Sequence, residues 1–282
     1  MLKRWIFIFI KPNPENSPFI KEIEAYDELG NKISTFSIVE KPLTIYLNDN
    51  HIITAMTVGD YPEYLAVGYL VNQNIIKDHT KIEKVEVVDD INTVVVRSSE
   101  ETLIDISNER KIKTSGCANG TIFDNIIDQI SEVKLDLKQK IKVDAIFALY
   151  KSINLTPSLY LKSGAIHGCV LCSKEKPLYF FEDVGRHNAI DKLAGYMFLN
   201  NINSEDKILY TTGRLTSEMV IKTVMMRVPI LASRSGFTAW GVELAQKSNL
   251  TMIGRLRGRK YTVLSGYERL IDKWILIIKR GL

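Results

Sequence analysis

Hydrophobic and polar positions follow two different rhythms along the chain, and the change falls near residue 141. Before that point, residues 33–58 and 82–96 alternate apolar and polar side chains, and each segment predicts a β-hairpin. A helix is predicted between them, because Asp60 and Pro62 are typical of a helix start and apolar residues recur behind them at helical spacing. The first part of the chain is therefore expected to be rich in β-structure, with one helix.

After residue 141, strand-like apolar runs alternate with amphipathic helical runs. The strand-like runs are residues 178–181, 208–211, 229–233 and 251–256, and the helical runs are residues 187–200, 216–227 and 238–248. This rhythm predicts an α/β sandwich with a largely parallel sheet. In such sheets ligands bind beyond the carboxyl ends of the strands. We therefore expect the segments FEDVGRHN, TTGRLTS and SRSGFT, in which strands pass into helices, to meet on one rim and form one site.

The composition is that of an ordinary soluble globular protein, with 282 residues, 45% of them hydrophobic and 25% charged. The net charge of +4 is too small to predict nucleic-acid binding. The apolar runs at residues 5–10 and 274–278 are too short for a signal peptide or a membrane span. Three cysteines, an odd number, do not form a disulfide framework and favour a reducing compartment. We expect a cytoplasmic protein with no nucleic-acid and no membrane partner.

Arginines stand in each of the three strand-to-helix segments, at Arg186, Arg214 and Arg234. Helix N-termini carry free N–H groups and a partial positive charge, so they bind anions, and guanidinium groups bind phosphates with two hydrogen bonds. Residues 254–260 add four cations within seven residues, a run that taken alone favours a solvated basic turn. Beside the three arginine segments, they favour a site for a phosphorylated ligand, although no P-loop or GxGxxG pattern is present.

Two of these segments allow predictions about single side chains. In the segment after the strand at 178–181, four residues are expected to line the ligand site, and two further residues are expected to orient them. The four are Asp183, Arg186, His187 and Asn188, and the two are Asp191 and Lys192. If the strand at 251–256 continues to Gly258, alternation places Arg255, Arg257 and Arg259 on one face and Leu256 on the other.

The cysteines fall into two groups. Cys117 lies between two glycines in TSGCANG, which predicts an exposed loop and either a nucleophilic, sulfur-carrying thiol or an incidental loop cysteine. Cys169 and Cys172 form a C-x-x-C, but they fall in a run that predicts a buried strand, where positions i and i+3 face opposite sides. We interpret them as structural, with a zinc site that includes His167 as the alternative. His167 itself is equally consistent with the site and with the core.

Eight segments carry a resemblance to a known family: KPLTIYLND, GDYPEYLAVGYL, the SGC loop, SGAIHG, EDVGRHNAIDKLAG, TTGRLTSEMVIK, SRSGFT and GRLRGRKYTV. In this order, over residues 38–266, they resemble the formate dehydrogenase accessory proteins of the FdhD/NarQ type. The resemblance implies a three-layer α/β sandwich with a cytidine-deaminase-like fold and a smaller N-terminal β-rich region, and a homodimer. It divides the chain into a β-rich region (1–113), a sulfur-carrier loop with a connecting helix (114–140) and the α/β domain (141–282).

The resemblance also implies a function: a sulfur carrier rather than a conventional multi-turnover enzyme. A cysteine desulfurase would load sulfane sulfur onto Cys117 as a persulfide, and the sulfur would pass to the bis-guanine-dinucleotide molybdenum cofactor needed by formate dehydrogenase. The cofactor, or GDP as its mimic, would bind at the rim. The residues expected there are Arg255, Leu256, Arg257, Gly258, Arg259, Lys260, Asp183, Arg186, His187, Asn188, Gly213, Arg214, Ser235 and His167.

The sequence departs from the family pattern at one place. Many members carry C-x-x-C in the sulfur loop, whereas here Gly120 stands where the second cysteine would be. This departure leaves open a cofactor-binding chaperone that delivers the molybdenum cofactor to an apo-enzyme without sulfur chemistry. Deamination is not expected, because the zinc signature of the deaminases is missing, and no bound metal is expected.

Overall fold

The computed structural model describes residues 10–15, 17–99, 111–112, 121–122 and 133–272. Cys117 and most of the two terminal apolar runs, at residues 5–9 and 274–278, lie outside these ranges. No helix among the described residues is long and apolar enough to cross a membrane.

A six-stranded sheet forms the centre of the molecule, with the strand order β11-β10-β12-β13-β14-β15. Its strands are β10 (His167–Cys172), β11 (Pro177–Asp183), β12 (Ile208–Thr211), β13 (Ile230–Ser233), β14 (Thr251–Arg257) and β15 (Lys260–Ser265). Only β12, β13 and β14 pair in parallel, so the predicted largely parallel sheet is wrong: three of the five pairings are antiparallel. The cause is the pair of short connections before β11 and after β14, which reverse the chain as hairpins.

The strand directions nevertheless support a common rim. Since β10 is antiparallel to both of its neighbours, β11 points the same way as β12, β13 and β14. The carboxyl ends of these four strands therefore share one edge of the sheet, and β10 begins at the same edge.

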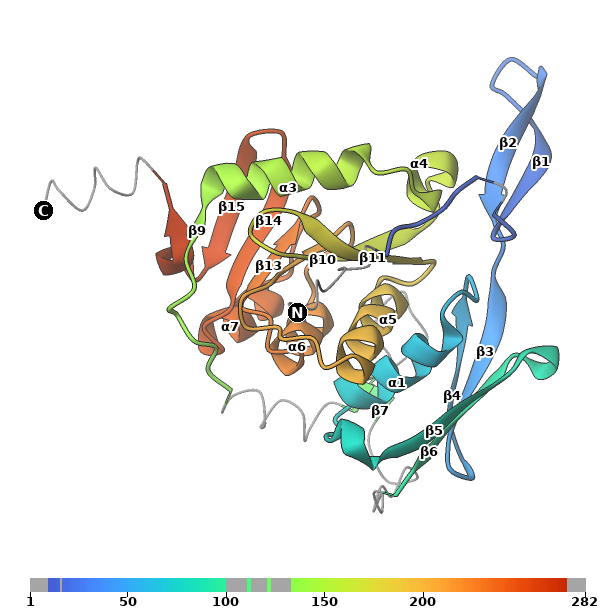
Figure 1. Cartoon of the computed structure of the whole chain (residues 1–282). Helices are drawn as coiled ribbons and strands as arrows, with labels where there is room; N and C mark the ends of the chain where they lie inside the picture. The colour runs from blue at the N-terminus through green and yellow to red at the C-terminus, as the bar shows by residue number, and fades with distance from the viewer. Residues whose placement is uncertain (1–9, 16, 100–110, 113–120, 123–132, 273–282) are drawn as a thin grey trace, which may run out of the picture.

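Helices cover both faces of this sheet, which gives three layers (Figure 1). One face carries α3 (Val143–Leu155), followed by the short α4 (Leu159–Ser163). The other face carries α5 (Arg186–Leu199), α6 (Ser217–Met225) and α7 (Ala239–Lys247). Each face has its own hydrophobic core, since strand residues at alternate positions point to opposite sides. The mixed α/β architecture and these helix and strand positions agree with the pattern of the sequence.

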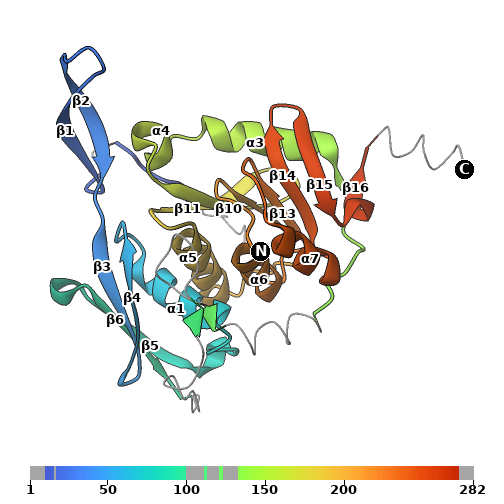
Figure 2. The ribbon, with the colours of Figure 1, turned by 180° about the vertical axis from the view of Figure 1, so that it is seen from behind.

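The N-terminal region forms a second, four-stranded sheet with the order β4-β3-β6-β5. Its strands are β3 (Lys41–Leu47), β4 (Asn50–Thr57), β5 (Ile82–Val88) and β6 (Thr93–Ser98), and both predicted hairpins are confirmed. Residues 33–38 are the exception, because they belong to a separate hairpin of β1 (Ile20–Tyr26) and β2 (Lys32–Ile38), which projects from the molecule in Figure 2. Shorter elements are β7 (Lys111–Ile112), β8 (Thr121–Ile122), β9 (Ile141–Lys142) and β16 (Leu270–Ile271), with 3-10 turns at His79–Lys81, Asp89–Ile91 and Tyr267–Arg269.

The two sheets are joined through α1 (Pro62–Asn72), which packs along α5. Glycines on both helices allow an unusually close approach. A Cβ atom at Gly68 would lie 1.7 Å from the carbonyl oxygen of Asp191, and one at Gly195 would lie 2.0 Å from that of Tyr64. The predicted helix is thus confirmed, although Asp60 is not its cap, because Tyr61 occupies the N-cap position.

Candidate functional site

The loops that follow β11, β12, β13 and β14 meet at the carboxyl edge of the central sheet, as the sequence predicts. Backbone hydrogen bonds join the second loop to the third: Leu215 N donates to Gly236 O at 2.9 Å, and Thr238 N donates to Leu215 O at 3.1 Å. The third is joined to β14, where Arg255 N donates to Ser235 O at 2.9 Å. At the start of β10, His167 stands opposite Asp183 in register. We call this set of loops, with His167, the rim.

Three arginines converge on His167. Burial lowers the pKa of His167, and the nearby cations Arg186, Arg214 and Arg234 lower it further. Of these residues Arg214 is exposed and Arg234 is half-buried, whereas Arg186 is buried against Gly213. The absence of a side chain at Gly213 is required there, since a Cβ atom would lie 3.0 Å from that of Arg186. This gathering of positive charge makes the rim a candidate anion site.

The N-termini of α5 and α6 both lie at the rim. Their N-cap residues, Gly185 and Thr216, make no side-chain capping hydrogen bond among the described residues. Thr216 Oγ1 is buried and has no hydrogen-bond partner in the part of the chain that the structure describes. Helix N–H groups that lack a side-chain acceptor are satisfied by water or by an anionic ligand. The sequence predicted such termini but did not single out Thr216.

His187 was expected to point toward the rim, but its side chain points into the interior. It is 2% exposed, and its Nε2 lies 2.9 Å from Glu218 Oε2, at the start of α6. Burial lowers the pKa of His187, partly offset by the hydrogen bond to Glu218, which raises it. A neutral imidazole that touches Glu218 joins the first turns of α5 and α6, so this residue positions the two helix N-termini relative to each other.

Asp183 also points into the interior. It was expected to line the ligand site, but its carboxylate belongs to a buried network. Its carboxylate accepts hydrogen bonds from Thr57 Oγ1 at 2.5 Å and Asn188 Nδ2 at 2.9 Å, and it pairs with Lys192 Nζ at 2.5 Å. Asn188 Nδ2 also donates to Met56 O at 2.7 Å. These groups are buried and satisfied by one another, so they hold the β11–α5 loop against the N-terminal sheet.

Lys192 and Asp191 extend this buried network to the other helices. Lys192 Nζ also donates to Asp60 and, at 3.1 Å, to the Glu182 carbonyl oxygen. Asp191 pairs with Lys222 of α6 at 2.6 Å and accepts a hydrogen bond from Asn72 of α1 at 2.7 Å. The dense run of polar residues in DVGRHNAIDK therefore serves mainly as a buried joint between the two sheets, with Arg186 as its contribution to the rim.

The basic segment after β14 is exposed but is not one row of arginines. Leu256 is buried on the α3 face while Arg255 and Arg257 are exposed, as alternation predicts. The register shifts between Gly254 and Arg257, and Arg255 has φ 54°, with its guanidinium 5.2 Å from the Phe237 ring centre. Beyond the strand end, Arg259 turns to α3. The predicted single face of three arginines is therefore wrong, because a bulge interrupts the strand.

Arg259 lies 6.0 Å from the Phe147 ring centre and 3.9 Å from Asp144 Oδ1, at the start of α3. Gly258 has φ 57°, a backbone conformation that suits glycine in the turn to β15, and Lys260 begins that strand. Leu256, whose side chain is buried, offers a ligand only its backbone.

Cys169 and Cys172 are buried in different cores, Cys169 under α5 and α6 and Cys172 under α3. The prediction of opposite faces is confirmed, and the two thiols cannot share a zinc ion. Burial raises the pKa of the Cys169 thiol to about 12, which keeps it protonated. Among the described residues no group of three metal-binding side chains is found.

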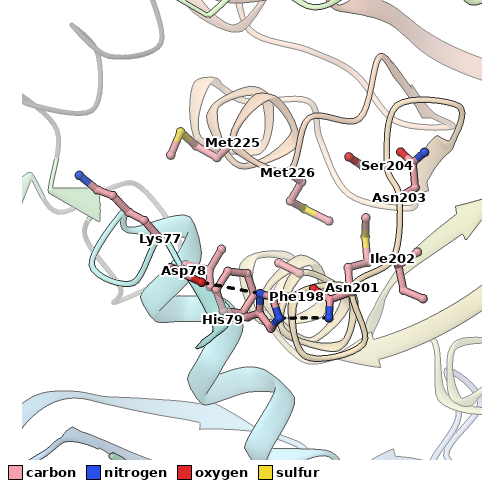
Figure 3. Close-up of a pocket in the computed structure, with 13 residues that line it drawn as sticks. Lys77, Asp78, His79, Phe198, Asn201, Ile202, Asn203, Ser204, Met225 and Met226 are labelled. Carbon is pink, nitrogen blue, oxygen red and sulfur yellow. Dashed lines mark hydrogen bonds and ion pairs between the residues drawn. The ribbon is translucent and has the colours of Figure 1, made fainter. Parts of the chain in front are cut away.

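A separate cavity of about 450 Å³ lies at the amino edge of the sheet, where α5 and α6 end (Figure 3). Met197, Met225 and Met226 line it, and so does His79, which contacts Asn201 at 3.2 Å. The rim lies at the opposite, carboxyl edge of the sheet, so this cavity is not part of the anion site.

The three-layer α/β fold and the rim place this molecule in a class: proteins that gather cationic side chains and uncapped helix N-termini at the carboxyl edge of a layered sheet. A model of the FdhD/NarQ family matches residues 38–271, and the chain belongs to this family.

Curated relatives named sulfur carrier protein FdhD are similar over most of their length. The protein from Saccharolobus solfataricus is 31% identical over 257 residues, which cover 89% of this chain and 95% of that protein. The one from Listeria monocytogenes serotype 4b is 29% identical over 257 residues, covering 89% and 97%. A crystal structure of a formate dehydrogenase accessory protein from Desulfotalea psychrophila superposes with a TM-score of 0.73 at 25% identity, covering 89% of this chain and 98% of that one.

Proposed function

We propose that this protein is a sulfur carrier that binds a guanine-nucleotide form of the molybdenum cofactor at the rim and sulfurates it for formate dehydrogenase. The names of its relatives support the sulfur-carrier role. One structural observation supports the nucleotide: the positive charges of Arg186, Arg214 and Arg234 gather around His167, beside two helix N-termini without a side-chain cap. A pyrophosphate group is an anion that matches this arrangement.

Sulfur would enter through Cys117, which lies outside the described residues. The Cys117 thiolate attacks the terminal sulfur of a desulfurase persulfide; the desulfurase cysteine leaves as a thiolate, and a persulfide forms on Cys117. One sulfur–sulfur bond breaks and one forms, so this step needs no further oxidant or reductant. A single cysteine is sufficient for it, and Gly120 in place of a second cysteine removes a route to loss of the sulfur through an internal disulfide.

Mass spectrometry of the protein after incubation with a cysteine desulfurase and cysteine tests this step. We expect a gain of one sulfur on Cys117, no gain in Cys117→Ala, and an unchanged gain in a Cys169→Ala/Cys172→Ala control. If Cys117→Ala still activates formate dehydrogenase normally, the alternative of a cofactor-delivering chaperone is correct instead.

Titration calorimetry with GDP tests the nucleotide site separately. Arg214→Ala and Arg257→Ala remove exposed guanidinium groups, and each is expected to weaken binding by about 1.5–3 kcal/mol, the usual worth of a charged hydrogen bond. Arg97→Ala is the matched control, because Arg97 is a half-exposed arginine on the N-terminal sheet. Equal GDP affinities in the wild type and all three variants would contradict the placement of the phosphates at the rim.

The same proposal includes finer features of the family: a cytidine-deaminase-like fold for the α/β domain, a homodimer, and a cysteine desulfurase and the formate dehydrogenase apo-enzyme as partners. The layered architecture described above is compatible with the first of these.

A further inference from the structure

Tyr210 carries a buried hydroxyl group that the fold does not account for. The residue is 3% exposed, and its hydroxyl oxygen has no hydrogen-bond partner within the described part of the chain. A buried polar group without a partner costs about 1–3 kcal/mol. A phenylalanine at this position would avoid that cost, so the hydroxyl is expected to have a partner that the folded chain does not provide.

The position of Tyr210 in the sheet places it just below the rim. It lies in β12, between Val170 of β10 and Ala232 of β13, one residue before the end of its strand. Its side chain faces α3, in the same core as Ile208. The rim and Tyr210 therefore lie on one edge of the sheet, with Tyr210 on the α3 face and the helix N-termini of the anion site on the other face.

Aromatic side chains and one cation surround the hydroxyl. Tyr150 of α3 makes an edge contact with Tyr210, with ring centres 6.1 Å apart. Arg234, directly after β13, stacks on the Tyr160 ring of α4 at 4.6 Å and donates a hydrogen bond to its hydroxyl. Burial raises the pKa of the Tyr210 hydroxyl, and the neighbouring Tyr150 raises it further.

Arg234 connects this group to the anion site. It belongs to the loop that follows β13, which is part of the rim, and its guanidinium lies 4.6 Å from the centre of the Tyr160 ring. Tyr150, Tyr160 and Arg234 are half-buried, so each presents part of its surface to solvent. A ligand that reaches across the edge would meet cations on one side and the accessible parts of the Tyr150 and Tyr160 rings on the other, and it would reach the buried Tyr210 hydroxyl by entering between these rings.

We propose that Tyr150, Tyr160 and Tyr210, the tyrosine cluster, together with Arg234, hold the purine base of the nucleotide whose phosphates bind at the rim. This inference rests on the proposed nucleotide site and assigns its base-binding part. Stacking of a base on an aromatic ring contributes about 1–3 kcal/mol, and the planar Arg234 guanidinium adds a cation–π contact. The Tyr210 hydroxyl supplies a hydrogen bond to a polar atom of the base, which satisfies the group that the fold leaves without a partner.

Calorimetric titration of the full chain with GDP and with inorganic pyrophosphate separates the base from the phosphates. The wild type is expected to bind GDP more tightly than pyrophosphate. Tyr210→Phe should weaken GDP binding about two- to twelvefold, which corresponds to one neutral hydrogen bond, and leave pyrophosphate affinity unchanged. Its thermal midpoint should not fall, because the removed hydroxyl has no partner in the fold.

Two further variants complete the test. Tyr160→Leu removes a stacking ring and should weaken GDP binding at least about fivefold. Tyr179→Phe is the control, because Tyr179 is equally buried but lies on the opposite face of the sheet, and it should bind both probes as the wild type does. Unchanged GDP affinity in Tyr210→Phe and Tyr160→Leu, or no preference of the wild type for GDP over pyrophosphate, overturns the base site. Binding of neither probe by the wild type overturns the nucleotide site and the base site together.

Discussion

Replacing Lys192 by methionine should strongly destabilise the protein. Lys192 is fully buried, and its ammonium group pairs with Asp183 and Asp60 and donates to a backbone carbonyl. Its pKa is raised: burial alone would lower it, but the charges of the two carboxylates outweigh that effect. Methionine preserves most of the side-chain volume, so the main consequence is a pair of carboxylates in the interior without their cation.

The magnitude follows from the asymmetry of buried ion pairs. Removal of one partner costs about 3–5 kcal/mol, because the remaining charge stays buried and uncompensated. Asp183 retains hydrogen bonds from Thr57, Asn188 and the Gly185 amide, so a value near the lower end is expected. Urea unfolding followed by circular dichroism measures the change. Adding Asp183→Asn to Lys192→Met should recover part of the loss, since the amide carries no charge.

Lys84→Met provides the matched control. Lys84 pairs with Glu86 at 2.7 Å, but its side chain is 67% exposed, and such solvent-screened pairs contribute little to stability. If the free energy of unfolding of Lys192→Met lies within about 1 kcal/mol of the wild-type value, the network is not the joint between the two sheets that the structure indicates.

Three other experiments test separate parts of the structure. Gly68→Ala should destabilise by about 1–3 kcal/mol in the same urea assay, because its methyl group would collide with the backbone of the facing helix; Gly236→Ala, where a Cβ atom meets nothing within 4 Å, should not. Burial raises the pKa of Glu182 from 4.5 to about 7, so the folded protein holds this proton more tightly and stability should fall as pH rises from about 4.5 to 7; Glu182→Gln should flatten that fall, and identical pH profiles would contradict it. Cys169 and Cys172 should resist iodoacetamide in the folded protein at pH 8 and react in urea, as judged by mass spectrometry; rapid labelling of either thiol without urea would show that it is not buried.

Local periodicity was enough to locate the elements. The predicted strand at 208–211 coincides with β12, and the predicted helix at 187–200 lies within one residue of α5 at each end. Each prediction depends on side chains a few residues apart, whose pattern follows from the geometry of one strand or one helix. The meeting of the strand-to-helix loops on one rim could also be anticipated, because strands that point the same way end at the same edge.

Strand order and direction could not be predicted from local periodicity. The sequence predicted a largely parallel sheet, but a hairpin connection sets β10 antiparallel between β11 and β12. A buried strand has the same apolar pattern whichever way its neighbours run, so the pattern carries no signal for direction.

The largest difference concerns the polar residues of DVGRHNAIDK. The sequence alone shows that many hydrogen-bonding groups follow β11, and it favoured a ligand site as the role of Asp183 and Asn188. Only the tertiary structure decided that their partners are Thr57, Met56 and Lys192, two of them more than 120 residues away in sequence. The role of a polar side chain depends on which groups reach it in space, and long-range packing, not local periodicity, brings those groups together.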